Sequence, residues 1–141
     1  MSSRPILNPM TGDTAFGHVD ALRLAGLDYE TAPILLFTGR HIGPHRGFGA
    51  RHIWSEHAVE MARFGFCAMD EVPAYVAKIV RTGTPLYFEG ASFRTTRLLA
   101  VRSTEGTTIL EYLDQRAGPV WSVVTAFSGT KTHGTRVGTV R

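Results

Sequence analysis

The sequence predicts an α+β fold, with N-terminal helices packed on one face of a four-stranded antiparallel β-sheet. Two observations lead to this prediction. Segments with helical spacing of apolar residues occupy the first part of the chain, and from residue 85 onward strand-like segments follow one another across short turns. Because the chain has 141 residues and is 43% hydrophobic, we expect a leader or linker over residues 1–17 and a single domain over residues 18–141.

The first segments of that domain differ in character. Residues 20–27 predict a short helix, and the compact apolar run TAPILLFTG over residues 31–39 predicts a buried strand or an extended segment. The next stretch, RHIGPHRGFGA over residues 40–50, is punctuated by glycine and proline and is expected to be a loop. Its basic and imidazole side chains are Arg40, His41, His45 and Arg46.

Two longer helices are expected next. Over residues 51–64, Trp54, Ala58 and Met61 recur at helical spacing, while His52 and Glu56 fall on the opposite, polar face.

The second helix lies within residues 69–83. Asp70 is the predicted N-cap, Pro73 suits the first turn, where its missing N–H costs little, and Gly83 is the predicted C-cap. The stripe expected to be buried consists of Val72, Val76, Ile79 and Val80.

Four strands complete the prediction, over residues 85–90, 93–102, 107–113 and 119–129. The short links between them predict an antiparallel meander. Because side chains alternate along a strand, Trp121, Val123, Thr125 and Phe127 are expected on one face of the last strand. The basic, glycine-dotted tail after residue 129 is expected to form an edge strand or to be loosely ordered.

Composition and charge narrow the class of protein. The net charge is +3 with six histidines, which fits an anionic partner but also an ordinary solvated surface. Cys67 is the one cysteine, so no intrachain disulfide can form. No apolar run approaches the roughly 20 residues of a membrane helix, and the first residues lack the apolar core of a signal peptide, so we expect no membrane span.

Four histidines lie close together in the sequence, yet their spacing argues against a metal site. His41 and His45 are separated by Gly-Pro, which cannot hold a helical pair, and His52 and His57 are five residues apart, on different faces of a helix. The chain has neither an HExxH nor a CxxC motif. We therefore expect no metal and no cofactor.

His52 is the predicted acid or base. It lies in the first helical turn, and Glu56 one turn later is expected to orient its imidazole and raise its pKa. Spacing alone fits a surface histidine equally well, just as Thr125 fits an ordinary strand residue. His57 lies on the apolar face of the helix and is expected at the border of the core.

The order of these features is a loop histidine, the RH that opens a helix, a second helix, a meander, and VVTAF in the last strand. Over residues 34–128 this order resembles the barnase/EndoU/colicin E5-D/RelE-like (BECR) nuclease superfamily, especially the short nuclease domains of phage proteins and polymorphic toxins. The resemblance implies a BECR-like fold and a metal-independent endoribonuclease toxin domain. It implies His52, Thr125 and His41 as catalytic residues, with a basic residue of the middle strands, for which Arg97 is one candidate.

Such an enzyme removes the proton of a ribose 2′-OH, which attacks the adjacent phosphate, while an acid protonates the departing 5′ oxygen. Basic side chains stabilise the negative charge that the phosphate gains. From the second predicted strand, Arg94, Arg97 and Arg102 either bind a phosphate or pair with a carboxylate such as Glu111. The candidates for substrate binding are Arg51, Arg40, Arg102 and Lys131, with His133 as a further basic residue in the tail.

The resemblance implies RNA as the partner, with tRNA as one candidate, together with a cognate immunity protein, and the cytoplasm of a target cell as the place of action. Two other classes stay open. An ADP-ribosyltransferase-like toxin would use a histidine such as His41 and an acidic strand residue such as Glu111. A non-catalytic module would bind nucleic acid or a partner protein without turnover.

Overall fold

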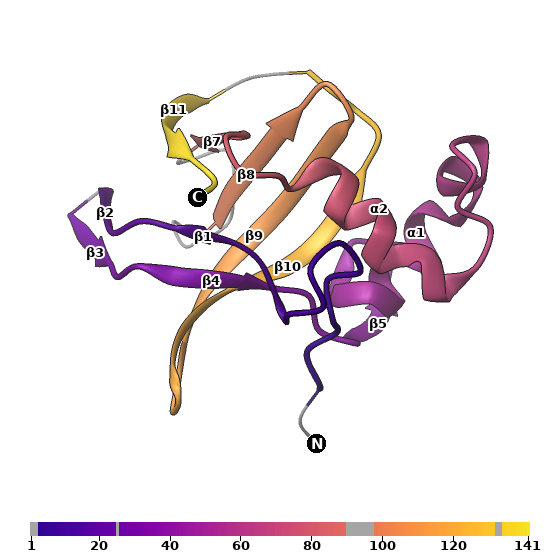
Figure 1. Cartoon of the computed structure of the whole chain (residues 1–141), viewed down its shortest axis with the longest axis horizontal. Coiled ribbons are helices and arrows are strands. Elements are labelled where there is room, and N and C mark those ends of the chain that lie inside the picture. The colour runs from indigo at the N-terminus through magenta and orange to yellow at the C-terminus, as the bar shows by residue number, and fades with distance from the viewer. Residues whose placement is uncertain (1–2, 25, 90–97, 132–133) are drawn as a thin grey trace.

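The chain is built mainly from β-strands, and its helices lie between strands rather than before them (Figure 1). The computed structural model describes residues 3–24, 26–89, 98–131 and 134–141. Its main sheet has seven strands in the order β1-β4-β10-β9-β8-β7-β11. These strands are β1 (Ala15–Val19), β4 (Ala32–Leu35), β7 (Pro85–Phe88), β8 (Leu98–Ser103), β9 (Gly106–Gln115), β10 (Gly118–Phe127) and β11 (Thr135–Thr139). The predicted four-stranded sheet with N-terminal helices is therefore wrong.

The predicted meander is confirmed as the centre of this sheet, because β7, β8, β9 and β10 pair antiparallel in sequence order. The error lies in the strands that flank it. The apolar run of β4 joins β10 in parallel, with Ile34 opposite Trp121, and β1 then pairs with β4. At the other edge, β11 pairs with β7. The tail therefore forms an edge strand, which was one of the two structures expected for it. The sheet thus draws strands from both ends of the chain.

The sheet curls until its two edges meet. The His18 N–H donates to the Arg141 carbonyl oxygen at 2.9 Å, and the Arg141 N–H donates back to the His18 carbonyl oxygen at 2.8 Å. β1 is thereby joined to the chain that follows β11, and Figure 1 shows this end of the chain beside β1 and β7. Fully buried side chains from several strands of the sheet, including Ile34, Leu99 and Leu110, belong to one hydrophobic core. Their removal from water supplies the main driving force for the fold.

Two helices pack against this sheet. Helix α1 (Gly49–Arg63) contacts β10, and α2 (Val72–Ile79) contacts β8 and β9. The bounds of the predicted helix over residues 51–64 are confirmed to within two residues at each end, but the helix is kinked at His57, where φ is −131°. The expected buried stripe of α2 is also confirmed, since Val72, Val76, Ile79 and Val80 are at most 3% exposed. Among the described residues, no helix combines the length and the apolar character needed to cross a membrane.

The predicted ends of the second helix are wrong. Asp70 lies within a short 3₁₀ helix, η1 (Met69–Glu71), and no side chain caps either helix. Within η1, the Glu71 Oε1 accepts the backbone N–H of Cys67 at 2.9 Å. Helix α2 ends at Ile79, so Gly83 lies beyond it in a turn.

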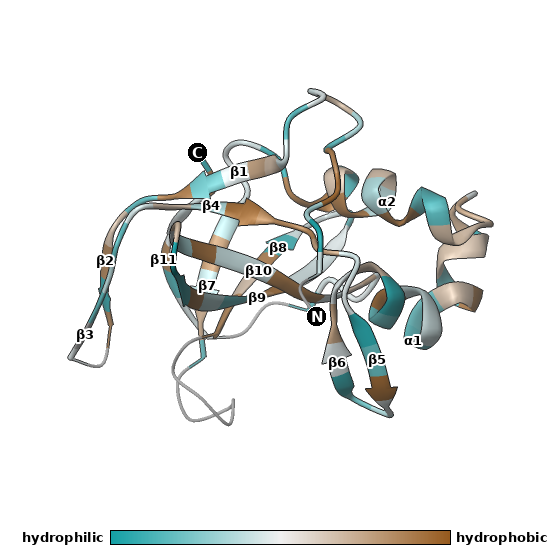
Figure 2. Ribbon diagram, turned by 90° about the horizontal axis from the view of Figure 1, so that it is seen from below, coloured by the Kyte–Doolittle hydropathy of each residue, from teal (hydrophilic) through white to brown (hydrophobic). Residues whose placement is uncertain are grey.

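Two segments predicted as helix and loop are β-hairpins. Residues 20–27 contain β2 (Leu22–Leu24), which pairs with β3 (Leu27–Tyr29), and Gly26 turns the chain with φ +79°. Residues 40–50 contain β5 (Arg40–Gly43) and β6 (Arg46–Phe48), whose hairpin lies beside α1 (Figure 2). Strands of three or four residues are too short to show a periodicity, so their sequences looked like loop or helix.

A β-bulge in β10 changes which face of the sheet its side chains point to. Val123 lies opposite Leu110 of β9, whereas Thr125 lies opposite Ile109, the next residue of β9. Since residues that lie opposite each other share a face and β9 alternates regularly, Thr125 and Val123 point to opposite faces. The prediction that they share one is wrong, because it assumed an unbroken alternation.

Candidate functional site

Two of the predicted catalytic histidines face each other where the β5–β6 hairpin packs on α1. The Nδ1 atoms of His41 and His52 are 3.1 Å apart, and their rings stack with centroids 5.2 Å apart. His41 is exposed, whereas His52 is only 3% exposed. One nitrogen must carry a proton and the other a lone pair, so a proton can pass between a buried imidazole and a solvent-facing one.

The hairpin reaches His52 because residue 47 is glycine. A Cβ atom at Gly47 would lie 2.2 Å from the Arg40 carbonyl oxygen and 2.8 Å from Nδ1 of His52. Gly47 also has φ +142°, a conformation that residues with side chains rarely adopt. The glycines of RHIGPHRGFGA thus let two strands pack closely on a helix, although they suggested a loop.

Glu56 holds the turn of the hairpin rather than the imidazole of His52. Its Oε1 accepts the backbone N–H of His45 at 2.9 Å and lies 3.6 Å from Nδ1 of the same residue. His45 has φ +59°, so this hydrogen bond stabilises a left-handed turn residue that is not glycine. The same hydrogen bond is the main reason that the pKa of Glu56 is lowered.

Burial lowers the pKa of His52. The Glu56 carboxylate acts in the opposite direction, but desolvation has the larger effect, and the neighbouring His41 adds to the lowering. The prediction that Glu56 gives His52 a raised pKa is therefore wrong in its net direction. A His52 that stays neutral near neutral pH is suited to accept a proton.

Two of the predicted substrate-binding arginines open onto the same place. A cavity of about 490 Å³ is lined by Arg40, His41, Arg51, Trp54, Ser55 and Met69. Both arginines are exposed, and neither is paired with a carboxylate of the described residues. Guanidinium groups without an acidic partner, next to an imidazole, favour an anionic ligand such as a phosphate.

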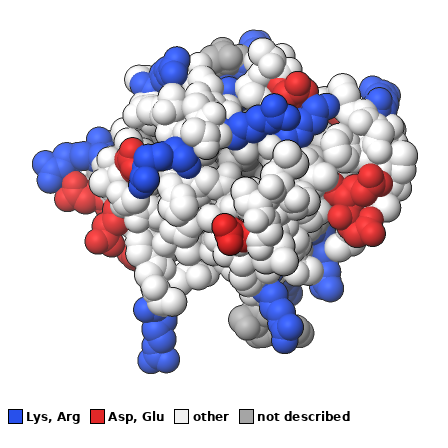
Figure 3. All heavy atoms as spheres, in the orientation of Figure 1, with Lys and Arg blue, Asp and Glu red and all other residues white. Residues whose placement is uncertain are grey.

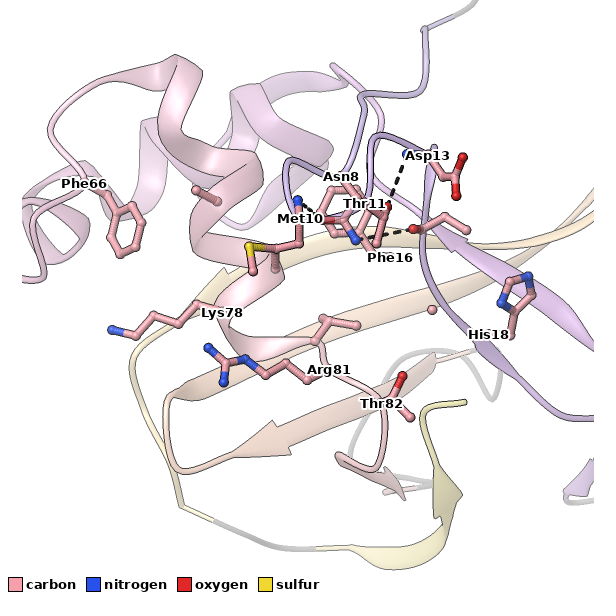
Figure 4. Close-up of a pocket in the computed structure, with 15 residues that line it drawn as sticks. Asn8, Met10, Thr11, Asp13, Phe16, His18, Phe66, Lys78, Arg81 and Thr82 are labelled. Atoms are coloured by element: carbon pink, nitrogen blue, oxygen red, sulfur yellow. Dashed lines mark hydrogen bonds between the residues drawn. The ribbon is translucent and has the colours of Figure 1, made fainter.

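A cavity of about 650 Å³ lies between the N-terminal loop and α2, but some of its polar side chains are already bonded within the protein (Figure 4). Asn8 Oδ1 accepts the Met10 N–H at 2.9 Å, and Thr11 Oγ1 accepts the Asp13 N–H at 3.2 Å. Lys78 at its edge pairs with Glu105 at 3.3 Å. Its size alone therefore does not make it the candidate site.

Arg102 belongs to a separate, buried network, to which the exposed Lys131 contributes only its backbone carbonyl oxygen. Arg102 Nη2 forms an ion pair with Glu89, and Nη1 donates to Thr107 Oγ1 at 3.2 Å and to the Lys131 carbonyl oxygen at 3.1 Å. The Arg102 residue is 7% exposed. The expected carboxylate partner, Glu111, is thus replaced by Glu89, 13 residues before Arg102 in the chain. Arg94, Arg97 and His133 lie outside the described residues.

Thr125 and His57 lie where α1 packs on β10. Thr125 Oγ1 is buried and has no hydrogen-bond partner among the described residues, so it is not bonded to His52. His57 is half-buried, with Nδ1 3.4 Å from Glu60 Oε1 and its ring against Phe127, in keeping with the expected border position. The structure brings His41, His52, Arg40 and Arg51 together, without Thr125 as a hydrogen-bonding partner.

Sequence reasoning missed the N-terminal segment. The Thr38 N–H donates to the Arg4 carbonyl oxygen at 3.0 Å, and the Gly39 N–H donates to Ser3 Oγ at 2.7 Å. Residues expected as a leader or linker are therefore bonded to residues 38 and 39, which directly precede the hairpin that carries His41. No local pattern signals this pairing, because it joins positions more than 30 residues apart.

No three or more His, Cys, Asp or Glu side chains of the described ranges converge in a way that could hold a metal ion. No protein-family model, curated protein or solved structure matches the chain. The resemblance of its motifs to BECR nucleases therefore stays a prediction.

Proposed function

We propose that this chain is a metal-independent endoribonuclease that cleaves RNA by attack of a ribose 2′-OH on the adjacent phosphate. The observation that carries the proposal is the 3.1 Å contact between exposed His41 and buried His52, beside a cavity lined by Arg40 and Arg51. An imidazole acid/base and unneutralised guanidinium groups are the side chains that this reaction requires.

His41 is the residue that contacts the RNA, because it is exposed and lines the cavity. Its Nε2 accepts the proton of the 2′-OH while its Nδ1–H is shared with Nδ1 of His52. The 2′ oxygen attacks the phosphorus, the bond to the 5′ oxygen breaks, and that oxygen takes up a proton from water. The exposed His41 then releases the proton it accepted to solvent, which restores the starting state. His52 acts through His41 and is a positioning residue, held neutral by its burial.

The two arginines supply the charge for the phosphate. Arg51 is fixed at the start of α1, since its N–H donates to the Thr38 carbonyl oxygen at 2.9 Å. Arg40 comes from the facing strand β5, so the two guanidinium groups approach the cavity from different elements. Trp54 lines the same cavity and can stack a base. The 2′-OH nucleophile restricts the reaction to RNA.

The proposal includes RNA as the partner, with tRNA as one candidate, and a cognate immunity protein. The support for the immunity protein, and for action in the cytoplasm of a target cell, is the resemblance to toxin nuclease domains. An immunity protein with an acidic surface would neutralise Arg40 and Arg51, which have no described carboxylate partner.

Incubation of the purified chain with total RNA in EDTA tests the proposal. We expect fragments that end in 2′,3′-cyclic phosphates, and a single 2′-deoxy substitution at a mapped site should abolish cleavage there. Loss of cleavage in EDTA would show that a metal is required. Salt-dependent RNA binding without any cleavage would show a binding module instead.

A further inference from the structure

The cavity at the histidine pair has a neighbour on the other side of Arg40 and Arg51. This second cavity, of about 620 Å³, is lined by both arginines and by Arg4, Thr38 and Phe48 among others. The first cavity has His41 and Trp54 in its wall. Because Arg40 and Arg51 line both, the two cavities are adjoining parts of one groove.

Arg4 is held in this groove by its backbone. The Thr38 N–H donates to the Arg4 carbonyl oxygen at 3.0 Å, the Ile6 N–H donates to the Leu36 carbonyl oxygen at 2.7 Å, and Pro5 forms a bridge with Phe37. This short pairing leaves the Arg4 side chain exposed at the second cavity. The position of its backbone is therefore set by pairing with residues 36–38, which follow β4.

The charge of this groove is not balanced by the protein. Arg4, Arg40 and Arg51 have no carboxylate partner among the described residues, whereas Arg23, Arg102 and Arg141 each pair with one. Three like charges that line adjoining cavities repel one another unless an anion lies between them. An anion with charges at two or more positions fits this arrangement better than a single phosphate.

We propose that the groove binds single-stranded RNA across both cavities, with the phosphate to be cleaved beside His41 and a neighbouring phosphate of the same strand at Arg4. Phe48, half-buried in the wall of the second cavity, stacks a base between them. A single strand is favoured because only unpaired bases can be splayed onto aromatic side chains. The choice of the cleaved phosphate rests on the proposed function, but the binding of the strand does not.

Binding of an uncleavable strand tests Arg4 without relying on catalysis. A fluorescent hexanucleotide with 2′-deoxy sugars is titrated at several salt concentrations against the wild type, Arg4→Ala and Arg116→Ala. Arg116 is the matched control, since it is an exposed arginine in the turn between β9 and β10. We expect Arg4→Ala to lose about tenfold in affinity and to flatten the salt dependence by about 0.7, the value for one phosphate of a single strand, whereas Arg116→Ala changes neither.

Cleavage of two substrates then locates Arg4 relative to the reaction. Arg4→Ala should lower kcat/KM on a hexaribonucleotide about tenfold and leave kcat/KM on a dinucleotide unchanged, because the dinucleotide has no second phosphate to bind. Equal losses in Arg4→Ala and Arg116→Ala, or an equal loss on both substrates, would overturn the inference while the proposed function stood. If no RNA is cleaved but the binding difference persists, the proposed function fails and the binding groove is supported.

Discussion

Arg102 and the arginines of the groove differ in what balances their charge. Arg102 is buried, and its guanidinium is neutralised by Glu89 and bonded to Thr107 and to the Lys131 carbonyl oxygen. Arg40 and Arg51 are exposed, and no described carboxylate neutralises them. A charge inside a protein requires a partner because its desolvation is costly, whereas a charge at the surface does not.

This difference shows how a structural arginine can be told from a functional one. Surface charge alone does not separate the two kinds of arginine, since Figure 3 shows basic and acidic side chains scattered over one face with uncharged surface between them. The partner of each guanidinium does separate them. Arg102, which the protein has already neutralised, contributes to folding, whereas Arg40 and Arg51, beside the histidine pair, are available to a ligand.

The largest effect is expected for His41→Ala. Loss of the acid/base that contacts the RNA should lower kcat/KM by about 10²–10⁴-fold. Because His41 is exposed, the thermal unfolding temperature should change little. His45→Asn is the matched control, since it changes another exposed histidine of the same hairpin and asparagine tolerates the left-handed conformation. Equal activity of the two variants would contradict the site assignment.

Arg102→Met should act on stability instead. Removal of Arg102 breaks this buried ion pair from one side, so we expect a loss of about 3–5 kcal/mol in the free energy of unfolding, measured with urea. The double variant Arg102→Met/Glu89→Gln should recover part of this loss, and Arg116→Met should be close to neutral. A stable Arg102→Met protein with weakened RNA binding would instead place Arg102 in the substrate site.

The smallest effect is a pH dependence that comes from His52. Its pKa is lowered in the folded chain from the ordinary value of 6.5, so the unfolded chain binds more protons as the pH falls below that value. The contribution of His52 to stability is therefore complete above pH 6.5 and is lost as the pH falls toward the folded-state pKa. Urea unfolding between pH 7.5 and pH 5 should show this decline, and His52→Gln should show less of it. An equal decline in both proteins would assign the pH dependence to other groups.

Several parts of this protein could be read from the sequence. The meander from β7 to β10 and helix α1 have regular patterns of sufficient length, and glycine marks the turns from β8 to β9 and from β9 to β10. The sequence also singled out His41, His52, Arg40 and Arg51, which the structure brings into one place. These residues lie within a dozen positions of one another, so a hairpin that folds onto the following helix is enough to gather them.

Other features depend on contacts that no local pattern records. The bulge in β10 breaks a regular period and turns Thr125 away from the face of Val123. Two other contacts join separate segments, namely the ion pair of Arg102 with Glu89 and the hydrogen bond between Arg4 and Thr38. The pKa of His52 belongs with them, since burial outweighs Glu56 only once the hairpin covers the helix. Local periodicity determined helix α1 and the strands of the meander. Burial and long-range pairing, which exist only in the folded chain, decided which charges are neutralised and which remain open to a ligand.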